Sequence, residues 1–336
     1  MIDRPTVLEI EGLCVELSIN GRWIPALNEV NLTIRRGETL GLIGESGSGK
    51  SLTALSVPGL LPGNARVTGG SIRLLGEELL GKQEHELNKL RSRSVALVFQ
   101  NPTTYLNPVL TIGQQIAEIF EVSPELLGPG RMSKRERRRI AQEKAVEYLR
   151  LVKIPDPERT VRQYPFELSG GMQQRTVIAM GLVRQPHLVI ADEITTALDV
   201  TIQAQILGLL TELRRSIDMT LLLITHDMGI VAQLADSVAV MYSGSVIEYA
   251  DVRSLFRAPK HPYAKALLEA VPTLQAGDTI FRPIPGGIPA ITDPPPGCRY
   301  HPRCSRAFAP CSVTVPAPVP PEPGRVVACH LYQAAS

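Results

Sequence analysis

The sequence predicts an α/β protein with an antiparallel β region at its N-terminus, a helical insertion in its middle and an irregular C-terminal extension rich in cysteine and proline. Strand-like apolar runs alternate with helical periodicity, which indicates a mainly parallel sheet. Residues from about 101 to 184 show helical periodicity almost throughout. Beyond residue 258 regular patterning fades, and 16 of the 28 prolines and four of the five cysteines lie there.

Composition narrows the class of protein. The chain has 336 residues, 44% of them hydrophobic, which is enough for a sizeable core in one large domain or two. Its formal net charge is +2, whereas a dedicated nucleic-acid binder usually carries a strong basic excess. No apolar run approaches the roughly 18 residues of a membrane-spanning helix, and Met1–Thr6 do not begin a secretion signal. We therefore expect a cytosolic protein.

Apolar alternation and the positions of glycine and proline assign the elements in chain order. The expected strands are Val7–Ile10, Cys14–Ile19, Val30–Ile34, Glu38–Ile43, Val95–Phe99, Leu188–Ala191, Leu221–Thr225 and Val238–Tyr242, with a hairpin-like stretch at Gly69–Leu80. The expected helices are a segment ending before Pro58, Ser133–Val152 with a capping box at Ser133 and Glu136, Thr201–Ser216 and Tyr263–Ala270.

A glycine-rich loop follows the strand at Glu38–Ile43. The residues that fit G-x-x-x-x-G-K-[ST] are Gly44, Glu45, Ser46, Gly47, Ser48, Gly49, Lys50 and Ser51, and Leu52 completes the expected nucleotide-binding set. Glycines let successive backbone N–H groups turn inward around phosphate oxygens at a helix N-terminus. Lys50 would reach the β and γ phosphates, and Ser51 would ligate Mg²⁺. The pattern predicts nucleotide binding, and a chance glycine-rich turn is the alternative.

Two acidic residues end a second apolar strand. Asp192 and Glu193 directly follow Leu188–Ala191. Ligands of open α/β sheets bind at the carboxyl ends of strands, so we expect Asp192 beside the Mg²⁺. Glu193 is suited to polarise an attacking water as a general base. Asp192 lies 142 positions after Lys50, too far for one βαβ unit, so an inserted subdomain must lie between them.

Further motifs carry a family resemblance. Residues 168–175 read LSGGMQQR, Gln100 follows a strand, Ala197-Leu198-Asp199 follows the acidic pair, and His226 follows another strand. Together with the glycine-rich loop and the acidic strand, these motifs resemble those of the ATP-binding cassette (ABC) ATPases. The resemblance implies a P-loop, RecA-like core and a head-to-tail dimer that encloses two ATP molecules.

The resemblance also implies a role for each motif. The signature residues that would bind the partner subunit's ATP are Ser169, Gly170, Gly171 and Gln173, and Asp199 would belong to the D-loop. The implied catalytic residues are Lys50, Gln100, Glu193 and His226, and the implied Mg²⁺ ligands are Ser51, Gln100 and Asp192. Taken alone, His226 would be an ordinary strand-end histidine. Where the family usually stacks an aromatic ring on adenine this chain has Leu17, and Trp23 is the nearby alternative.

Three segments are similar to the dipeptide/oligopeptide branch of the ABC importers: Asn107-Pro108, HPYAKALL at 261–268 and GCRYHPRC at 297–304. The resemblance implies an ATPase that powers peptide import, peripheral to the cytoplasmic face of the inner membrane. Its implied partners are a second, related ATPase subunit, two transmembrane permease subunits and an extracytoplasmic substrate-binding protein. Nickel complexes or glutathione are alternative substrates, and a soluble ABC ATPase acting on nucleic acid or ribosomes is the alternative of another class.

The domain assignment follows from the motif order. We expect residues 1–258 to form the nucleotide-binding domain, with its helical subdomain at about 101–184, and residues 259–336 to form an importer-type extension. The extension holds Cys298, Cys304, Cys311 and Cys329, with gaps of 5, 6 and 17 residues. Four thiolates can hold a [4Fe–4S] cluster or a tetrahedral zinc ion, and the spacing does not choose between them.

The family resemblance favours the [4Fe–4S] cluster over the other fates of these cysteines. Zinc, with His301 or His330 as further ligands, and unligated thiols are the alternatives. Cys14 is expected to be a buried structural cysteine.

A basic run comprises Arg131, Lys134, Arg135, Arg137, Arg138 and Arg139. We expect it to be a solvated helix face, with a nucleic-acid surface or a site near acidic lipid head groups as alternatives.

Overall fold

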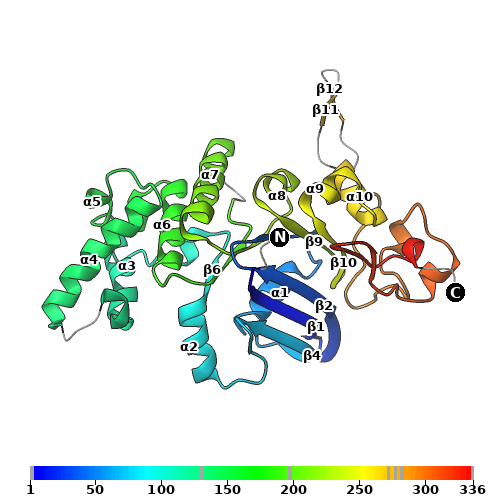
Figure 1. Cartoon of the computed structure of the whole chain (residues 1–336), viewed down its shortest axis with the longest axis horizontal. Coiled ribbons are helices and arrows are strands. Elements are labelled where there is room, and N and C mark those ends of the chain that lie inside the picture. The colour runs from blue at the N-terminus through cyan, green and yellow to red at the C-terminus, as the bar shows by residue number, and fades with distance from the viewer. Residues whose placement is uncertain are drawn as a thin grey trace. The chain divides into compact units, whose positions relative to one another are not determined.

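The computed structural model of the chain describes residues 4–128, 132–195, 199–270 and 284–333, and the backbone of 273–275 and 278–280. The chain divides into two compact units (Figure 1). Unit 1 comprises Met1–Lys82 and Leu221–Ser336, and unit 2 comprises Gln83–Thr220. None of the helices within the described ranges is both long and apolar enough to cross a membrane.

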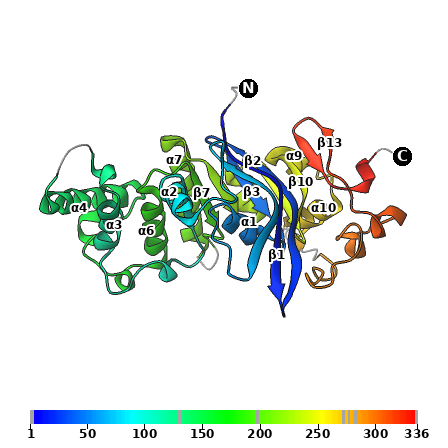
Figure 2. The ribbon, with the colours of Figure 1, turned by 90° about the horizontal axis from the view of Figure 1, so that it is seen from below.

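An antiparallel sheet forms the first part of unit 1. Its strands, in the order β2-β1-β4-β5, are β2 (Arg22–Arg35), β1 (Thr6–Ile19), β4 (Ala65–Leu74) and β5 (Glu77–Glu78). Figure 2 shows β1 and β2 as one long ribbon, closed by the Asn20-Gly21 turn, in which both residues have positive φ. The two short strands expected between Val7 and Ile19 are one strand, because register shifts near Gly12 bend it without ending it.

The second sheet of unit 1 carries the glycine-rich loop. Its strands in spatial order are β13 (Val319–Glu322), β14 (Arg325–Val327), β10 (Ser245–Asp251), β9 (Ser237–Tyr242), β3 (Thr39–Ile43) and β8 (Leu221–Ile224). β3 pairs in parallel with both β8 and β9, and all three strands are buried along their whole length. This burial explains their unbroken apolar runs, which the sequence showed without polar alternation.

The helices of unit 1 and the C-terminal extension share one apolar core with this sheet. The helices are α1 (Lys50–Ser56), α8 (Met228–Leu234), α9 (Val252–Arg257) and α10 (Pro262–Glu269). Figure 1 shows the part of the extension that follows α10, coloured orange to red, beside that helix. Its Tyr300 is 4% exposed and packs in one cluster with Tyr242 of β9 and Tyr263 of α10. The extension is therefore mostly irregular, as expected, but it is bound into the core.

Short elements complete the extension. They are the strands β11 (Thr273–Gln275) and β12 (Asp278–Ile280) and the 3₁₀ turns His301–Arg303, Ala309–Ser312 and His330–Tyr332. In β1, Cys14 is half-buried, with its Sγ 3.4 Å from the Glu29 amide nitrogen, so the expectation of a buried cysteine was wrong. Its neighbours Leu13 and Val15 are buried, and Cys14 alternates with them onto the less buried face of the sheet.

Unit 2 contains a parallel strand pair and the expected helical block. The strands are β6 (Val95–Val98) and β7 (Leu188–Asp192). The helices are α2 (Glu84–Ser94), α3 (Ile112–Val122), α4 (Lys134–Leu151), α5 (Pro157–Thr160), α6 (Gly170–Leu182) and α7 (Val200–Ile217), with 3₁₀ turns at Pro102–Thr104, Pro124–Leu127 and Pro165–Glu167. Phe120 of α3 and Leu149 of α4 are almost completely buried where these helices pack.

In the long helix α4 the Ser133 half of the predicted capping box is present. Ser133 precedes its first turn, and the Ser133 hydroxyl accepts a hydrogen bond from the Glu136 amide at 3.2 Å. The basic residues of α4 are mostly exposed, and Arg139 pairs with Glu143 at 2.7 Å, as expected of a solvated face. Arg131, the first residue of the basic run, lies outside the described residues.

Candidate functional site

The glycine-rich loop connects the buried strand β3 to α1, and its backbone conformation requires glycine. Gly44, Gly47 and Gly49 have φ of 151°, 80° and 106°. A Cβ atom on Gly44 would lie 2.3 Å from the Met241 carbonyl oxygen, so no larger residue fits. Ser46 and Gly47 are exposed at the tip. The loop therefore has the strand-to-helix context and the open N–H groups that phosphate binding needs.

Lys50 is folded back over the loop. Its side chain is buried, and Nζ donates hydrogen bonds to the carbonyl oxygens of Gly44 at 2.7 Å and Glu45 at 2.9 Å. The ammonium group is thus held above the loop at its mouth, where phosphate oxygens would arrive. Ser48 is fully buried, and its hydroxyl has no hydrogen-bonding partner within the described part of the chain. Ser51 is exposed at the first turn of α1, and Leu52 after it is half-buried.

His226 lies at the same edge of the sheet as the loop. It follows β8, which runs parallel to β3 with Ile224 opposite Leu42, so the carboxyl ends of both strands meet at one edge. His226 is exposed, and the next residue, Asp227, caps α8 by accepting hydrogen bonds from the Gly229 and Ile230 amides. The structure therefore brings the predicted switch histidine and the predicted phosphate-binding loop together within unit 1.

Gln100, Asp192 and Glu193 follow neighbouring strands of unit 2. β6 and β7 are parallel, with Val98 opposite Ala191, so Gln100 and the acidic pair emerge at the same edge. Glu193 has φ of 49°, a left-handed conformation that costs a residue with a Cβ atom about 1 kcal/mol or more. Burial raises the pKa of Tyr105, and the charge of Asp192 raises it further, which places the Tyr105 hydroxyl in the field of that carboxylate.

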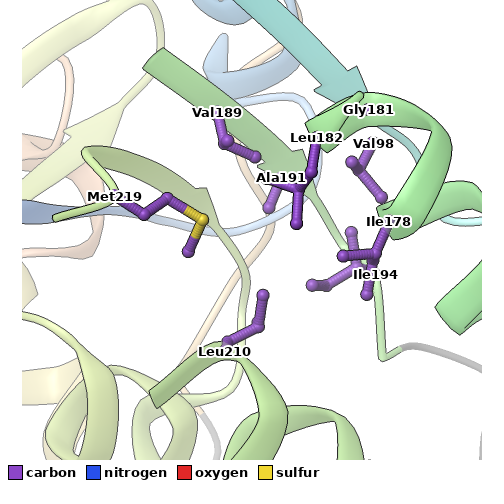
Figure 3. A pocket seen from close by; sticks show the side chains of 9 residues that line it. All are labelled: Val98, Ile178, Gly181, Leu182, Val189, Ala191, Ile194, Leu210 and Met219. Atoms are coloured by element: carbon purple, nitrogen blue, oxygen red, sulfur yellow. The ribbon is translucent and has the colours of Figure 1, made fainter. Parts of the chain in front are cut away.

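An apolar layer lies beneath these strand ends (Figure 3). A cavity of about 10 Å³ is lined by Val98, Ile178, Gly181, Leu182, Val189, Ala191, Ile194, Leu210 and Met219. Figure 3 shows side chains from both strands and from α6 and α7 pointing into it. The lining has no polar side chain, and the volume is at the lower limit for a single water molecule. This cavity is therefore a packing gap rather than a ligand site. It gives Asp192 and Glu193 a rigid apolar support.

The predicted signature residues begin helix α6. The Ser169 hydroxyl accepts a hydrogen bond from the Met172 amide at 3.4 Å and caps the helix, with Gly170 exposed at its first position. Gly171 is buried, and a Cβ atom there would lie 2.7 Å from Ile202 of α7. Gln173 donates from Nε2 to the Pro165 and Leu168 carbonyl oxygens. The Gln173 side-chain nitrogen therefore stabilises the loop that precedes α6. The signature motif did not indicate these hydrogen bonds.

Asp199 caps helix α7, the next helix of the same unit. Its carboxylate accepts a hydrogen bond from the Ile202 amide at 2.9 Å. The other two residues of the predicted D-loop, Ala197 and Leu198, lie outside the described residues. The Asp199 side chain thus has a local helix-capping role alongside the one that the motif implies.

Of the two candidates for adenine stacking in unit 1, Leu17 is not aromatic and Trp23 has one ring face covered. Leu17 in β1 is half-buried opposite Ile24 of β2. Trp23 is 42% exposed, and the Arg66 guanidinium lies 4.1 Å from the centre of its ring. Because Arg66 also pairs with Glu16 at 2.7 Å, it is fixed over that ring. Stacking on Trp23 would have to use the opposite face.

The four C-terminal cysteines line one small cavity. Cys298, Cys304, Cys311 and Cys329 are free thiols around a volume of about 10 Å³. Burial raises the pKa of Cys298, Cys304 and Cys329, to about 11 for Cys298, and the neighbouring cysteines raise it further. Within the described residues, no three His, Cys, Asp or Glu side chains stand close enough to hold a metal ion. The expected metal centre is therefore not preformed.

Two observations bear on whether a cluster fits these cysteines. None of the four lies in an α-helix or a β-strand, and the Cys298 amide donates to the Cys311 carbonyl oxygen at 2.9 Å, which joins two of the cysteine-bearing turns. His261, 1% exposed, lines the same cavity, and its Nδ1 accepts a hydrogen bond from the Tyr263 amide at 3.0 Å. The proton of the neutral ring is then on Nε2, which is buried and has no partner among the described residues. The donor set and this orphaned N–H suit a sulfur-rich group.

The chain is similar to known proteins along almost its whole length. Residues 27–196 match the family described as ABC transporter. The chain is 45% identical to the oligopeptide transport ATP-binding protein OppD of Escherichia coli (strain K12) over 323 residues, 96% of this chain and 92% of that protein. The chain belongs to the ABC transporter family. The prediction made from the motifs is thereby confirmed.

Further similarities cover the C-terminal part of this ABC ATPase and, for a second relative, nearly its whole length. Residues 247–311 match the C-terminal region of the oligopeptide/dipeptide transporters. The chain is 43% identical to the oligopeptide transport ATP-binding protein AppD of Bacillus subtilis (strain 168), over 98% of this chain and 97% of that one. Among solved structures, it resembles the ATP-binding cassette MJ0796 in a dimeric post-hydrolysis state bound to ADP and Pi, with a TM-score of 0.61, 28% identity, and 73% of this chain and 99% of that chain covered.

Some functional candidates were not among the sequence predictions. His261 and Tyr263 lay in a segment that served only as a family marker, and Arg303 lay in the cysteine-bearing run. Arg303 forms an ion pair with Glu45 of the glycine-rich loop at 2.8 Å. The partners are 258 positions apart, so no local pattern could have joined them.

Proposed function

We propose that this ABC ATPase is the ATP-hydrolysing subunit of a membrane transporter that imports peptides. The observation that carries the proposal is the similarity to oligopeptide transport ATP-binding proteins, which runs through both the cassette and the extension. In this proposal residues 1–258 form the nucleotide-binding domain, with a helical subdomain at about 101–184, and residues 259–336 form the importer-type extension. The extension is included in the proposal because residues 247–311 match the C-terminal region of the oligopeptide/dipeptide transporters.

In the proposed site, residues 44–52 hold the triphosphate. Backbone N–H groups of the loop bind phosphate oxygens, and Lys50, already held above the loop, neutralises the β and γ phosphates. Ser51, Gln100 and Asp192 are the proposed ligands of Mg²⁺, a set of oxygen donors of the kind that ion prefers. The ion, when bound, offsets charge that develops on the phosphates.

Hydrolysis is assigned to a water that attacks the γ-phosphorus in line with the bond to ADP. As the new oxygen–phosphorus bond forms, the bond to the bridging oxygen breaks and ADP leaves. Glu193 accepts the proton of the attacking water and returns it to the phosphate product. His226 donates a hydrogen bond to the γ-phosphate, and Lys50 stabilises the leaving charge. The fixed left-handed backbone of Glu193 supports this role, because it sets the direction of the carboxylate.

The signature residues are assigned to the ATP of a partner. Ser169, Gly170, Gly171 and Gln173 begin α6, whose N-terminal N–H groups favour a γ-phosphate. Asp199 is assigned to the contact with that partner. We propose that the partner is a second, related ATPase subunit, and that the pair binds two permease subunits peripherally on the cytoplasmic face of the inner membrane. A substrate-binding protein on the outer side would deliver the peptide.

The test is peptide-dependent ATP hydrolysis by the purified native complex. We expect the complex to contain two permease subunits, and peptide delivered by its binding protein to stimulate ATP turnover. Glu193→Gln should retain ATP binding but lower turnover at this site about 100-fold or more, because a general base contributes that much. Peptide-independent turnover in the intact complex would contradict peptide import, and near-normal turnover in the Glu193→Gln variant would contradict the role of Glu193.

We further propose that Cys298, Cys304, Cys311 and Cys329 hold a [4Fe–4S] cluster. Zinc would hold four thiolates about 2.3 Å from a single centre, whereas a cluster spreads them over four iron corners. All four cysteines line one cavity, which supports a shared metal group, and the family resemblance favours the cluster over zinc. When bound, the cluster supplies covalent crosslinks between four points of an irregular chain. His261 is placed to donate its Nε2 proton to a sulfur there.

Iron and sulfide analysis of anaerobically purified protein tests this assignment. We expect about four iron atoms per chain, visible charge-transfer absorbance, and loss of both in Cys311→Ser. Cys14→Ser is the matched control, because Cys14 lies in β1, outside the cavity lining, and should leave the iron content unchanged. One zinc ion per chain without iron would contradict the cluster.

A further inference from the structure

Glu45, the second residue of the phosphate-binding loop, is held at two points by the C-terminal part of unit 1. Its backbone N–H donates to the Tyr263 hydroxyl at 2.9 Å. Its carboxylate pairs with both terminal nitrogens of Arg303, at 2.8 and 3.2 Å. Such a two-pronged pair fixes orientation as well as distance.

Arg303 is itself rigidly placed. Its side chain is 4% exposed, and its Nε donates to the Pro285 carbonyl oxygen at 2.8 Å. One terminal nitrogen also donates to the Tyr242 hydroxyl at 3.3 Å. Burial opposes the charge, but hydrogen bonds to Glu45 and Tyr242 raise the pKa of Arg303 overall. The guanidinium is therefore a permanent cation against the loop.

The position of Glu45 bears directly on Lys50. The Glu45 carbonyl oxygen accepts hydrogen bonds from Lys50 Nζ at 2.9 Å and from the Ser48 amide at 3.2 Å. A shift of Glu45 would therefore move an anchor of the phosphate-binding lysine. It would also change the loop's own hydrogen bonding.

The extension does not need Glu45 for its own attachment. Arg325 of β14 pairs with fully buried Glu248 of β10 at 3.0 Å, and the Lys260 amide donates to the same carboxylate at 3.1 Å. Tyr300 is packed in the core. These contacts hold the extension on the sheet without the loop, so the Arg303–Glu45 pair chiefly affects the loop.

We propose that Arg303 is a positioning residue of the ATP site. It holds Glu45, and with it the carbonyl oxygen that anchors Lys50, in place before nucleotide arrives, so less ordering remains to be done on binding. It also neutralises a carboxylate that would otherwise repel the triphosphate. Because Arg303 directly precedes Cys304, the cysteine-bearing segment acts on ATP affinity through this pair.

The test is calorimetric titration of the full chain with MgATP, in a Glu193→Gln background that prevents turnover. Arg303→Met should raise the Kd for MgATP about tenfold, because the loop is released and the Glu45 charge is exposed. Arg303→Lys keeps the positive charge beside Glu45 but cannot form the two-pronged pair, so it should recover only part of the lost affinity. The affinity still missing in Arg303→Lys measures the positioning of the loop separately from the neutralisation of Glu45.

Lys260→Met is the matched control. It breaks another ion pair of the extension, and it should leave the Kd for MgATP unchanged. An unchanged Kd in Arg303→Met would overturn the proposal. So would a Kd in Arg303→Lys equal to that of the parent, or an equal loss of affinity in Lys260→Met.

Discussion

The phosphate-binding loop and the C-terminal extension belong to the same unit but are held in different ways. The loop is fixed by backbone: buried parallel strands on both sides of β3 and glycines at positive φ. The extension is fixed by side chains that reach across the chain, such as Arg325, which pairs with Glu248, and Tyr300, which packs in the core. A backbone-built site leaves a short sequence motif, whereas a side-chain-built one does not. The contrast predicts different points of weakness in each region.

Arg325→Met should have the larger effect on stability. It leaves Glu248, which is fully buried, without its cation, and removing one partner of a buried pair costs about 3–5 kcal/mol. Urea denaturation monitored at the extension should detect the loss. Burial raises the pKa of Glu248, and Arg325 lowers it, so in Arg325→Met the carboxylate should take up a proton more readily and the deficit should shrink as pH falls.

Two further variants separate the buried charge from other causes. Glu248→Gln combined with Arg325→Met should recover part of the stability, because no buried charge remains. Arg139→Met breaks an exposed pair with Glu143 and should change stability by about 0.5 kcal/mol or less. Equal losses in Arg325→Met and Arg139→Met would mean that the extension is not held by its buried pair.

Gly44→Ala tests the backbone-built region and should have the next largest effect. The new methyl would lie 2.3 Å from the Met241 carbonyl oxygen and 2.8 Å from the Ser48 hydroxyl, at a φ of 151°. Overpacking and strain together should cost about 3 kcal/mol in the free energy of unfolding, measured in urea. Gly63→Ala, where the methyl meets open space, should stay within about 0.5 kcal/mol. A tolerated alanine at Gly44 would show that the loop is not set by its backbone.

The same contrast explains how much could be predicted from the sequence. Apolar runs and the glycine-rich motif predict strand β3, the loop after it and β7 with its acidic end. They can do so because local backbone geometry determines these elements. Helix α2 was not predicted, since its sequence is polar and only Ser94 is buried. β14 was not predicted either, because three residues pair only when β10 offers them an edge. Tertiary contact, rather than local propensity, forms such elements.

Within the candidate site the limit lies in side-chain partners. The glycine-rich motif placed Lys50 at the start of α1, and the signature motif placed Gly171 at the start of α6. Gly171 is also required for the close contact with Ile202 of α7. Gln173 was expected only to face a partner's ATP, yet its amide holds the loop before its own helix. The pairing of Glu45 with Arg303 spans most of the chain and could be seen only once the chain was folded.

The short hairpin of β13 and β14 has a consequence for the integrity of the whole sheet. It covers the outer edge of β10, with Val326 opposite Tyr249 and Val327 opposite Glu248. Without these last strands β10 would present unpaired N–H and C=O groups, a template for pairing with the edges of other chains. A chain that loses its final residues, by premature termination or by proteolysis, would therefore become prone to aggregation rather than simply shorter.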